Sequence, residues 1–254
     1  MNRTWVAWLG ALALFGAAPV VAQTAQMTFA QTQQAAQRGD AKAQYRLGVI
    51  YDSGEGVAAD PRKAFDWFQR AAMQGLPEAQ YNVAVMYDEG QGVAQSFVMA
   101  ANWYNAAAEQ GVVEAQYNLG MMYAQGQGPA QDDATAAYWL YKAANQGYAP
   151  AQYNIGLSYL NGAGVAVDPL TACHWFLMAA RQGDGESQIE IAKCYETGRG
   201  GARDPVKAYA WALVAVETGQ DGSGAYLEGL GATVNDKQKN LAINMASGLV
   251  NPAS

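Results

Sequence analysis

The sequence predicts an all-α fold, a solenoid of five helix-turn-helix repeats with capping helices at both ends. Two observations predict it. Several residue types recur every 36 residues without a single insertion, and alanine and glycine are abundant whereas β-branched residues are comparatively scarce. The fixed interval is typical of repeat architectures, and the composition favours closely packed helices over a sheet.

Four residue series keep this interval. They are the tryptophans Trp67, Trp103, Trp139, Trp175 and Trp211; the glutamines Gln44, Gln80, Gln116, Gln152 and Gln188; the tyrosines Tyr51, Tyr87, Tyr123, Tyr159 and Tyr195; and the turns Gly54/Gly56, Gly90/Gly92, Gly126/Gly128, Gly162/Gly164 and Gly198/Gly200. Chance does not align several residue types in this way. The series therefore indicate five copies of one structural unit.

Each copy is expected to form two helices, which we call helix A and helix B. In the first copy helix A covers residues 41–53, and Gly54 follows as the left-handed residue that ends it. Helix B begins at Asp60 and Pro61, because aspartate accepts a backbone N–H bond at a helix start and proline suits the first helical position. Helix B ends at Gly75. The cap position is also held by Ser96, Asp132, Asp168 and Asp204, and the end position by Gly111, Gly147, Gly183 and Gly219.

Helix B carries the packing residues of each copy. In the first copy Ala64, Trp67, Phe68 and Ala71 recur at helical spacing on one face. The alanines let neighbouring helices approach closely, and we expect the tryptophan to fill the gap between layers. A single helix pair does not bury its apolar faces alone, so the copies are expected to stack.

The first 22 residues are typical of a signal peptide. Arg3 precedes an apolar run over residues 5–15, and Val20 and Ala22 stand at the −3 and −1 positions of a cleavage site before Gln23. The alternative is an uncleaved membrane anchor, but the run is short for a bilayer span. No later stretch is apolar enough to cross a membrane. We therefore expect the protein in the periplasm or secreted, without membrane insertion after cleavage.

The remaining chain divides into an N-terminal cap, the repeats and a C-terminal cap. Residues 23–40 are expected to form a capping half-repeat, because residues 28–38 match only the second half of a copy. The five repeats occupy 41–76, 77–112, 113–148, 149–184 and 185–219. Residues 220–254 are assigned to C-terminal capping helices: the register fails in a glycine-rich stretch, and residues 235–248 are expected to form a polar closing helix.

Charge and motif content argue against nucleic-acid binding and catalysis. The formal net charge is −7, which repels nucleic acid and anionic lipid. The Gly-x-Gly turns follow helices and do not complete a dinucleotide loop, and the single histidine, His174, occupies a variable helix position. The sequence holds no G-x-S-x-G, S-x-x-K or C-x-x-C motif. We predict no catalytic residues, no metal and no cofactor.

The repeat itself resembles a known family. The segments AQYNLGMMYAQGQG (115–128) and KAFDWFQRAAMQG (63–75) resemble the Sel-one-like repeat, a branch of the tetratricopeptide-like α-solenoids. The resemblance covers residues 41–219, and TVNDKQKNLA (233–242) is similar to the closing helix common in bacterial members. It implies a right-handed superhelix that acts as an adaptor. Exported bacterial members are associated with envelope signalling, polysaccharide export and host contact, and the family does not name a partner.

Comparison of the five copies identifies a candidate binding surface. In helix A the residues that vary between copies are the second, sixth, ninth and thirteenth, whose spacing gives one continuous face that we call the helix A stripe. In tetratricopeptide-like folds helix A lines the concave face. The residues expected to contact a partner are Arg46, Asn82, Val85, Glu89, Asn118, Met121, Gln125, Asn154, Leu157, Asn161 and Glu190. The asparagine amides both donate and accept hydrogen bonds, although asparagine is also the usual residue of this family at that position.

These observations favour a non-enzymatic scaffold that binds a partner protein or peptide on its concave face in the bacterial envelope, with a regulatory role in signalling or export. We expect the protein to be a monomer. The alternative is a cell-wall or β-lactam-related hydrolase or binding protein, because some exported members of the family have been described as penicillin-binding or β-lactamase-like.

The two cysteines present a choice between a disulfide and two buried thiols. Cys173 lies early in helix B of the fourth copy and Cys194 late in helix A of the fifth. These helices are expected to be antiparallel neighbours, which places the two residues at nearly the same height. Because an exported chain meets an oxidising compartment, a disulfide is the favoured prediction. Free cysteines that pack in a helical core are the alternative.

Overall fold

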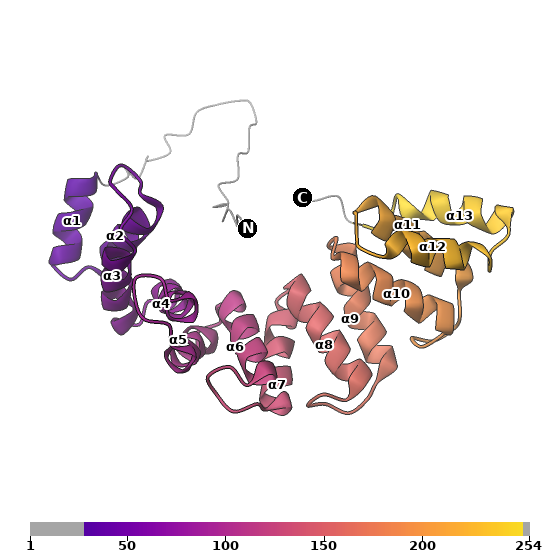
Figure 1. Cartoon of the computed structure of the whole chain (residues 1–254), viewed down its shortest axis with the longest axis horizontal. Helices are drawn as coiled ribbons and strands as arrows, with labels where there is room; N and C mark the ends of the chain where they lie inside the picture. The colour runs from indigo at the N-terminus through magenta and orange to yellow at the C-terminus, as the bar shows by residue number, and fades with distance from the viewer. Residues whose placement is uncertain (1–27, 251–254) are drawn as a thin grey trace, which may run out of the picture.

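The computed structural model describes residues 28–250, and within that range it contains thirteen α-helices and no strand. The predicted signal peptide therefore lies outside the described residues. The helices follow one another along an open arc, with the capping helices at its two ends (Figure 1). The predicted all-α solenoid is confirmed.

Ten of the thirteen helices are the five predicted pairs, each helix thirteen residues long. Helix A of the successive copies is α2 (Ala41–Ser53), α4 (Pro77–Glu89), α6 (Val113–Gln125), α8 (Ala149–Asn161) and α10 (Gly185–Thr197). Helix B is α3 (Pro61–Met73), α5 (Phe97–Glu109), α7 (Asp133–Asn145), α9 (Pro169–Arg181) and α11 (Pro205–Glu217). In Figure 1, α2, α4 and α6 lie on the inner side of α3, α5 and α7. The inner side of the arc is therefore built from helix A.

The helix ends follow from the local sequence. Asp60 accepts a hydrogen bond from the backbone N–H of Lys63 at 3.1 Å, and a serine or aspartate caps helix B in the same way in each other copy. Helix A of the first copy ends at Gly54, whose φ of 74° is left-handed. Because both signals are local, these boundaries were predictable from residue types alone.

In copies two, three and four the second turn glycine packs against the backbone of the preceding copy. A Cβ atom at Gly128 would lie 2.5 Å from the carbonyl oxygen of Phe97, the first residue of helix B in the preceding copy. Gly92 and Gly164 approach the corresponding backbone equally closely. The fifth copy differs from the predicted pattern: its left-handed residues are Gly198 and Gly201 rather than Gly198 and Gly200.

A ladder of buried glutamines ties the copies together. The side chain of Gln116 donates to the carbonyl of Ala108 in the preceding helix B at 3.1 Å and accepts from the side chain of Gln146 at 2.8 Å. Gln44, Gln80, Gln152 and Gln188 occupy the same position and make equivalent bonds. Each glutamine thus bridges helix B of the preceding copy and the end of helix B in its own copy. We call this series the glutamine ladder.

The tryptophan series is less uniform than predicted. Trp139, Trp175 and Trp211 are buried between layers, whereas Trp67 and Trp103 are only half-buried. Trp67 packs against the cluster of Ala36, Ala43 and Leu47, and the guanidinium of Arg70 lies 4.6 Å from its ring centre. In the first two copies the residue after the tryptophan, Phe68 or Tyr104, is the deeply buried one.

The capping segments complete the fold. The N-terminal half-repeat forms α1 (Phe29–Gln37), and the predicted closing helix is α13 (Asp236–Ala246), capped by Asn235. The glycine-rich stretch before it also forms a helix, α12 (Ser223–Gly231), which the repeat register did not predict. A hydrogen bond of 2.9 Å from Tyr226 to Glu196 joins α12 to α10.

Candidate partner-binding surface

The helix A stripe lies on the surface along the inner side of the arc. Of the eleven predicted partner-contacting residues, Glu89, Gln125 and Asn161 are exposed and the other eight are half-buried. The half-buried residues are Arg46, Asn82, Val85, Asn118, Met121, Asn154, Leu157 and Glu190. The structure thus brings residues from five copies into one continuous surface.

The asparagines of the stripe contact the preceding copy. The side chains of Asn82, Asn118 and Asn154 lie close to tyrosines of the preceding helix A, namely Tyr45, Tyr81 and Tyr117, and each lowers the pKa of its tyrosine against the larger effect of burial. Asn154 also donates to the carbonyl of Pro150 at 2.8 Å. These amides were predicted as partner contacts, but each also lies against a tyrosine within the solenoid.

A row of tyrosines flanks the stripe and was not identified from the sequence. The row consists of Tyr45, Tyr81, Tyr117 and Tyr153, the fifth residue of helix A in the first four copies, and all are half-buried. Three of the rings pack against helix B of their own copy, with centroid distances of 5.6 Å to Phe68, 5.9 Å to Tyr104 and 5.9 Å to Phe176. The recurrence of Tyr, rather than Phe or Leu, was the available signal that one end of the ring meets polar groups.

Glutamates from the next copy face these tyrosines. Burial raises the pKa of Tyr81 to about 12, and the charge of Glu114 contributes in the same direction. Burial and the charge of Glu186 likewise raise the pKa of Tyr153 to about 12. These glutamates occupy the second position of helix A, so their carboxylates and the tyrosine hydroxyls form one polar surface across the boundary between copies.

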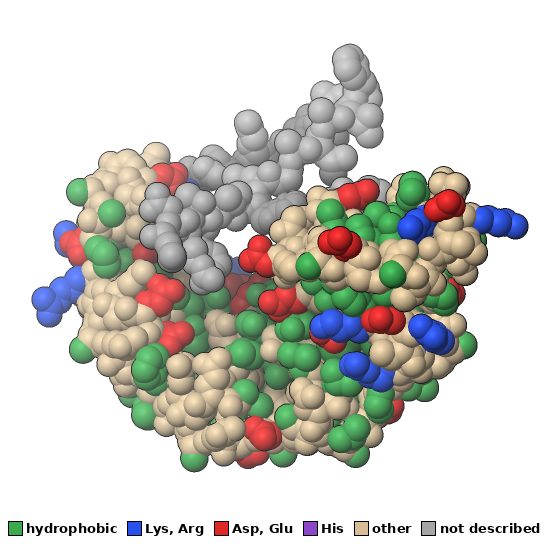
Figure 2. All heavy atoms as spheres, turned by 45° about the vertical axis from the view of Figure 1, so that its right-hand side comes forward, with side chains coloured by type: hydrophobic (Ala, Val, Ile, Leu, Met, Phe, Trp, Pro, Cys, Tyr) green, Lys and Arg blue, Asp and Glu red, His purple; other side chains and the backbone are tan. Residues whose placement is uncertain are grey.

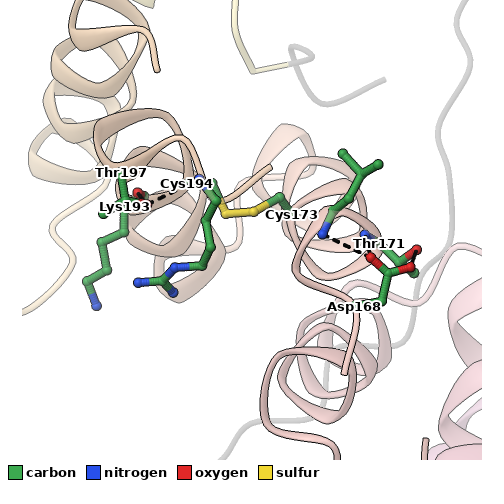
Figure 3. The surroundings of a disulfide bond; sticks show 8 residues. Asp168, Thr171, Cys173, Lys193, Cys194 and Thr197 are labelled. Atoms are coloured by element: carbon green, nitrogen blue, oxygen red, sulfur yellow. Dashed lines mark hydrogen bonds between the residues drawn. A yellow bond between two sulfur atoms is a disulfide. The ribbon is translucent and has the colours of Figure 1, made fainter. Parts of the chain in front are cut away.

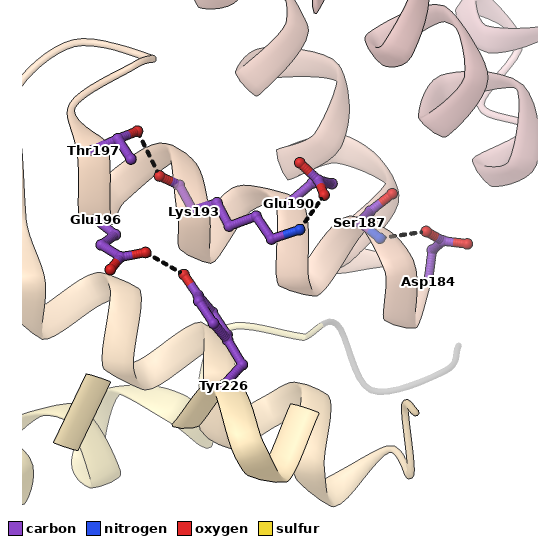
Figure 4. Close-up of polar contacts among 7 residues, drawn as sticks. All are labelled: Asp184, Ser187, Glu190, Lys193, Glu196, Thr197 and Tyr226. Atoms are coloured by element: carbon purple, nitrogen blue, oxygen red, sulfur yellow. Dashed lines mark hydrogen bonds and ion pairs between the residues drawn. The ribbon is translucent and has the colours of Figure 1, made fainter. Parts of the chain in front are cut away.

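The surface changes character toward its C-terminal end. Val85, Met121 and Leu157 give the middle copies an apolar strip, whereas the fifth copy places Lys193 at that position. The Lys193 ammonium lies 2.7 Å from a carboxylate oxygen of Glu190. This pair, with the Tyr226–Glu196 bond, forms a polar cluster between α10 and α12 (Figure 4). A partner would therefore meet an apolar strip in copies two to four and a charged cluster in copy five.

A disulfide joins the fourth and fifth copies close to this cluster. Cys173 of α9 and Cys194 of α10 are bonded, with their Cα atoms 6.0 Å apart (Figure 3). Gly200 lies against Cys173, and a Cβ atom on this glycine would stand 2.9 Å from the Cys173 sulfur. The turn that departs from the glycine pattern is therefore the one beside the disulfide. A covalent link at this boundary takes the place of the glycine contact found between the earlier copies.

The described residues offer no metal site. Among residues 28–250, no group of three or more His, Cys, Asp or Glu side chains is placed to hold a metal ion. His174 is exposed on α9 and lines a small cavity of about 180 Å³ beside the disulfide, together with Leu170 and Tyr195. No helix in this part of the chain is both long and apolar enough to cross a bilayer.

Comparison with known proteins agrees with this architecture. The model of the Sel1 repeat family matches five times, at residues 41–76, 77–112, 113–148, 149–184 and 185–219. Two solved structures are similar over most of the chain. The first is the Escherichia coli protein c5321, a protective antigen of uropathogenic strains with an SLR fold, at 33% identity and a TM-score of 0.78 over 89% of this chain and 50% of that one. The second is a Sel1 repeat protein from Oxalobacter formigenes, at 32% identity and a TM-score of 0.72 over 83% of this chain and 88% of that one.

The chain thus spans half the length of the Escherichia coli protein and nearly all of the Oxalobacter protein that it matches. A search of curated protein sequences gives no match. The family model covers most of the chain without a gap, and both similar structures display the same repeat. The chain belongs to the Sel1 repeat family.

Proposed function

We propose that this protein is a non-catalytic scaffold of the bacterial cell envelope that holds a partner protein or peptide on the helix A stripe. Sel1 repeat proteins are generally scaffolds for protein interaction, and the fold is typically non-catalytic. The observation that carries the proposal is the stripe itself. It varies between copies where the packed face does not, and it offers apolar, amide and carboxylate groups on one surface.

The location in the envelope rests on the N-terminal sequence. Arg3, the apolar run and the Val20-x-Ala22 site support export and cleavage before Gln23. N-terminal sequencing of the protein recovered from the periplasm or medium is expected to begin at Gln23. An intact Met1 on the exported protein would contradict this part of the proposal.

Photo-crosslinking in living cells tests the proposed surface. A benzophenone amino acid at Gln125, the last residue of α6 on the stripe, is expected to capture a partner. The matched control carries the same probe at Asn145, the last residue of α7 on helix B of the same copy. Both positions are exposed, so the comparison separates the two surfaces without disturbing the core. Equal capture from both positions, or capture from Asn145 alone, would contradict the proposal.

The hydrolase alternative is tested separately. If the protein acted on β-lactams, the purified chain would turn over nitrocefin. The scaffold proposal predicts no turnover above that of a buffer control. Saturable hydrolysis by the purified protein would overturn the non-catalytic assignment.

A further inference from the structure

The middle copies of the solenoid carry almost no positive charge. Between Arg70 and Arg181 the only basic residue is Lys142, whereas eight residues are acidic. The acidic residues are Glu78, Asp88, Glu89, Glu109, Glu114, Asp132, Asp133 and Asp168. With Arg181 and Asp184 included, copies two to four carry nine acidic residues and two Lys or Arg, a net charge of −7 that equals the formal net charge of the whole chain.

The eight acidic residues are divided equally between the two kinds of helix, but the basic residues are not. Glu78, Asp88, Glu89 and Glu114 lie on helix A, whereas the other acidic residues lie on helix B or at its caps. Both basic side chains of copies two to four are on helix B. Lys142 is on α7, where its ammonium lies 4.8 Å from the ring centre of Tyr138, and Arg181 is the last residue of α9. No Lys or Arg of the middle copies therefore lies on helix A.

The helix A carboxylates are left without counter-ions. The salt bridges among residues 28–250 are Lys63–Asp60, Lys193–Glu190 and Lys207–Asp204, and none includes a carboxylate of α4 or α6. Glu78, Glu89 and Glu114 are all exposed. In Figure 2 acidic side chains lie on both inner walls of the hollow, with hydrophobic side chains between them. Unpaired carboxylates beside an apolar strip attract a cation that also has an apolar part.

The neighbouring side chains fit the same kind of ligand. Lysine and arginine have long apolar stems that cover surfaces such as Val85 and Met121 while the charged end stays solvated. The half-buried ring of Tyr81 stands close to Glu114 and Glu89, and aromatic faces attract cations. We infer that the stripe in copies two and three binds a peptide segment that carries lysine or arginine together with apolar side chains. This inference rests on the proposed function and names the chemical class of the partner.

The probe for the test is a fluorescein-labelled twelve-residue peptide of alternating Lys and Leu. Its control, called the mirror peptide, has the same length and label and carries Glu in place of each Lys. Fluorescence anisotropy measures binding of each peptide to the whole mature chain. The stripe variant carries Glu78→Gln, Glu89→Gln and Glu114→Gln. The matched control carries Asp66→Asn, Glu109→Gln and Glu217→Gln, three exposed carboxylates of helix B that change the net charge by the same amount. Circular dichroism melts verify that both variants remain folded.

The Lys and Leu peptide is expected to bind the wild-type chain, and the mirror peptide is expected not to bind. The stripe variant should weaken binding by about fivefold or more, because three exposed ion pairs are lost, while the control should stay within about twofold. Raising the salt concentration should weaken binding to the wild type more than to the stripe variant. Equal weakening by both variants would show attraction to net charge alone and would overturn the inference, as would equal binding of the mirror peptide.

The outcome is separable from that of the proposed function. If the probe at Gln125 captures a partner in cells and the stripe variant captures it equally well, the charge preference is wrong and the scaffold surface stands. If capture occurs only from Asn145, the proposed surface is wrong and the inference falls with it.

Discussion

The glutamine ladder gives the sharpest prediction about stability. The variant Gln116→Leu keeps the approximate size of the side chain and removes two hydrogen bonds, one to the Ala108 carbonyl at 3.1 Å and one from Gln146 at 2.8 Å. Gln116 is 3% exposed, so the leucine side chain of the variant would occupy the same buried position without either hydrogen bond. Each buried hydrogen bond contributes about 0.5–1.5 kcal/mol to the free energy of unfolding, so the pair contributes about 1–3 kcal/mol.

The surroundings place the expected cost in the lower part of that range. The carbonyl of Ala108 still accepts from the backbone N–H of Gly111 at 3.0 Å, and Gln146 is exposed and reaches water. Neither partner is therefore left buried without a hydrogen bond. We expect Gln116→Leu to lower the free energy of unfolding by about 1–2 kcal/mol. For a chain of this size that corresponds to a fall in Tm of about 2–8 °C.

Urea unfolding followed by circular dichroism measures this loss. Gln125→Leu, an exposed change on the same helix, serves as the control and should alter stability by less than about 0.5 kcal/mol. In a double-mutant cycle, Gln116→Leu and Gln146→Leu should couple by about 0.5–1.5 kcal/mol because they share one bond. A Gln116→Leu protein as stable as the wild type, or a coupling near zero, would refute the role of the ladder in holding the copies together.

Three further predictions follow from the structure. Trp139→Ala removes a buried indole and should cost about 3–5 kcal/mol of unfolding free energy, whereas Asn118→Ala on the stripe should cost much less; equal thermal melts of the two variants would contradict the assignment of core and surface. The Cys173–Cys194 disulfide closes a 21-residue separation, so its reduction should lower the unfolding free energy by about 3 kcal/mol, and the unfolded, unreduced chain should show no reactive thiol. Burial and the charge of Glu114 raise the pKa of Tyr81 to about 12, so its folded form holds a proton that the unfolded chain loses near pH 10, and stability should fall as the pH rises from about 10 to 12. Ultraviolet absorbance of tyrosinate follows this step, and full ionisation of every tyrosine at pH 10.5 in the folded protein would contradict it.

The helix boundaries were predictable because their signals are local. The N-cap at Asp60, the proline after it and the left-handed Gly54 each fix one end of a helix through their own backbone chemistry. The 36-residue interval then carried these boundaries from one copy to the next. Helix boundaries were predictable in this way up to Gly219, where the 36-residue repeat ends.

The features that were missed depend on contacts between copies. The glycine-rich sequence of α12 has little helical preference, and this helix is supported by packing on α11 and by the bond from Tyr226 to Glu196. In the fifth copy the second left-handed glycine is Gly201, and Gly200 lies against the side chain of Cys173 instead of the start of the preceding helix B. Neither contact could be predicted from the sequence of one copy, because each joins residues of two segments that meet only in the folded chain.

The stripe was predictable as a surface, but its internal contacts were not. Variation between copies separates exposed from packed positions, and that reasoning placed Asn118 and Met121 correctly at the surface. A recurring residue such as Tyr81 was assigned to the packed face, because recurrence alone does not distinguish a buried core from the wall of a surface. The contact between the Asn118 side chain and Tyr81 crosses two copies and arises only when they are stacked.

The central claim is that a partner binds on helix A of the middle copies, and carboxyl footprinting of the partner complex tests it most directly. Carbodiimide coupling of glycine ethyl ester labels exposed carboxylates, and mass spectrometry compares the labelling with and without the captured partner. The account predicts that the partner protects Glu78, Glu89 and Glu114 and leaves Glu109 and Asp66 fully labelled. Protection of Glu109 and Asp66, with unchanged labelling of the helix A glutamates, would contradict it.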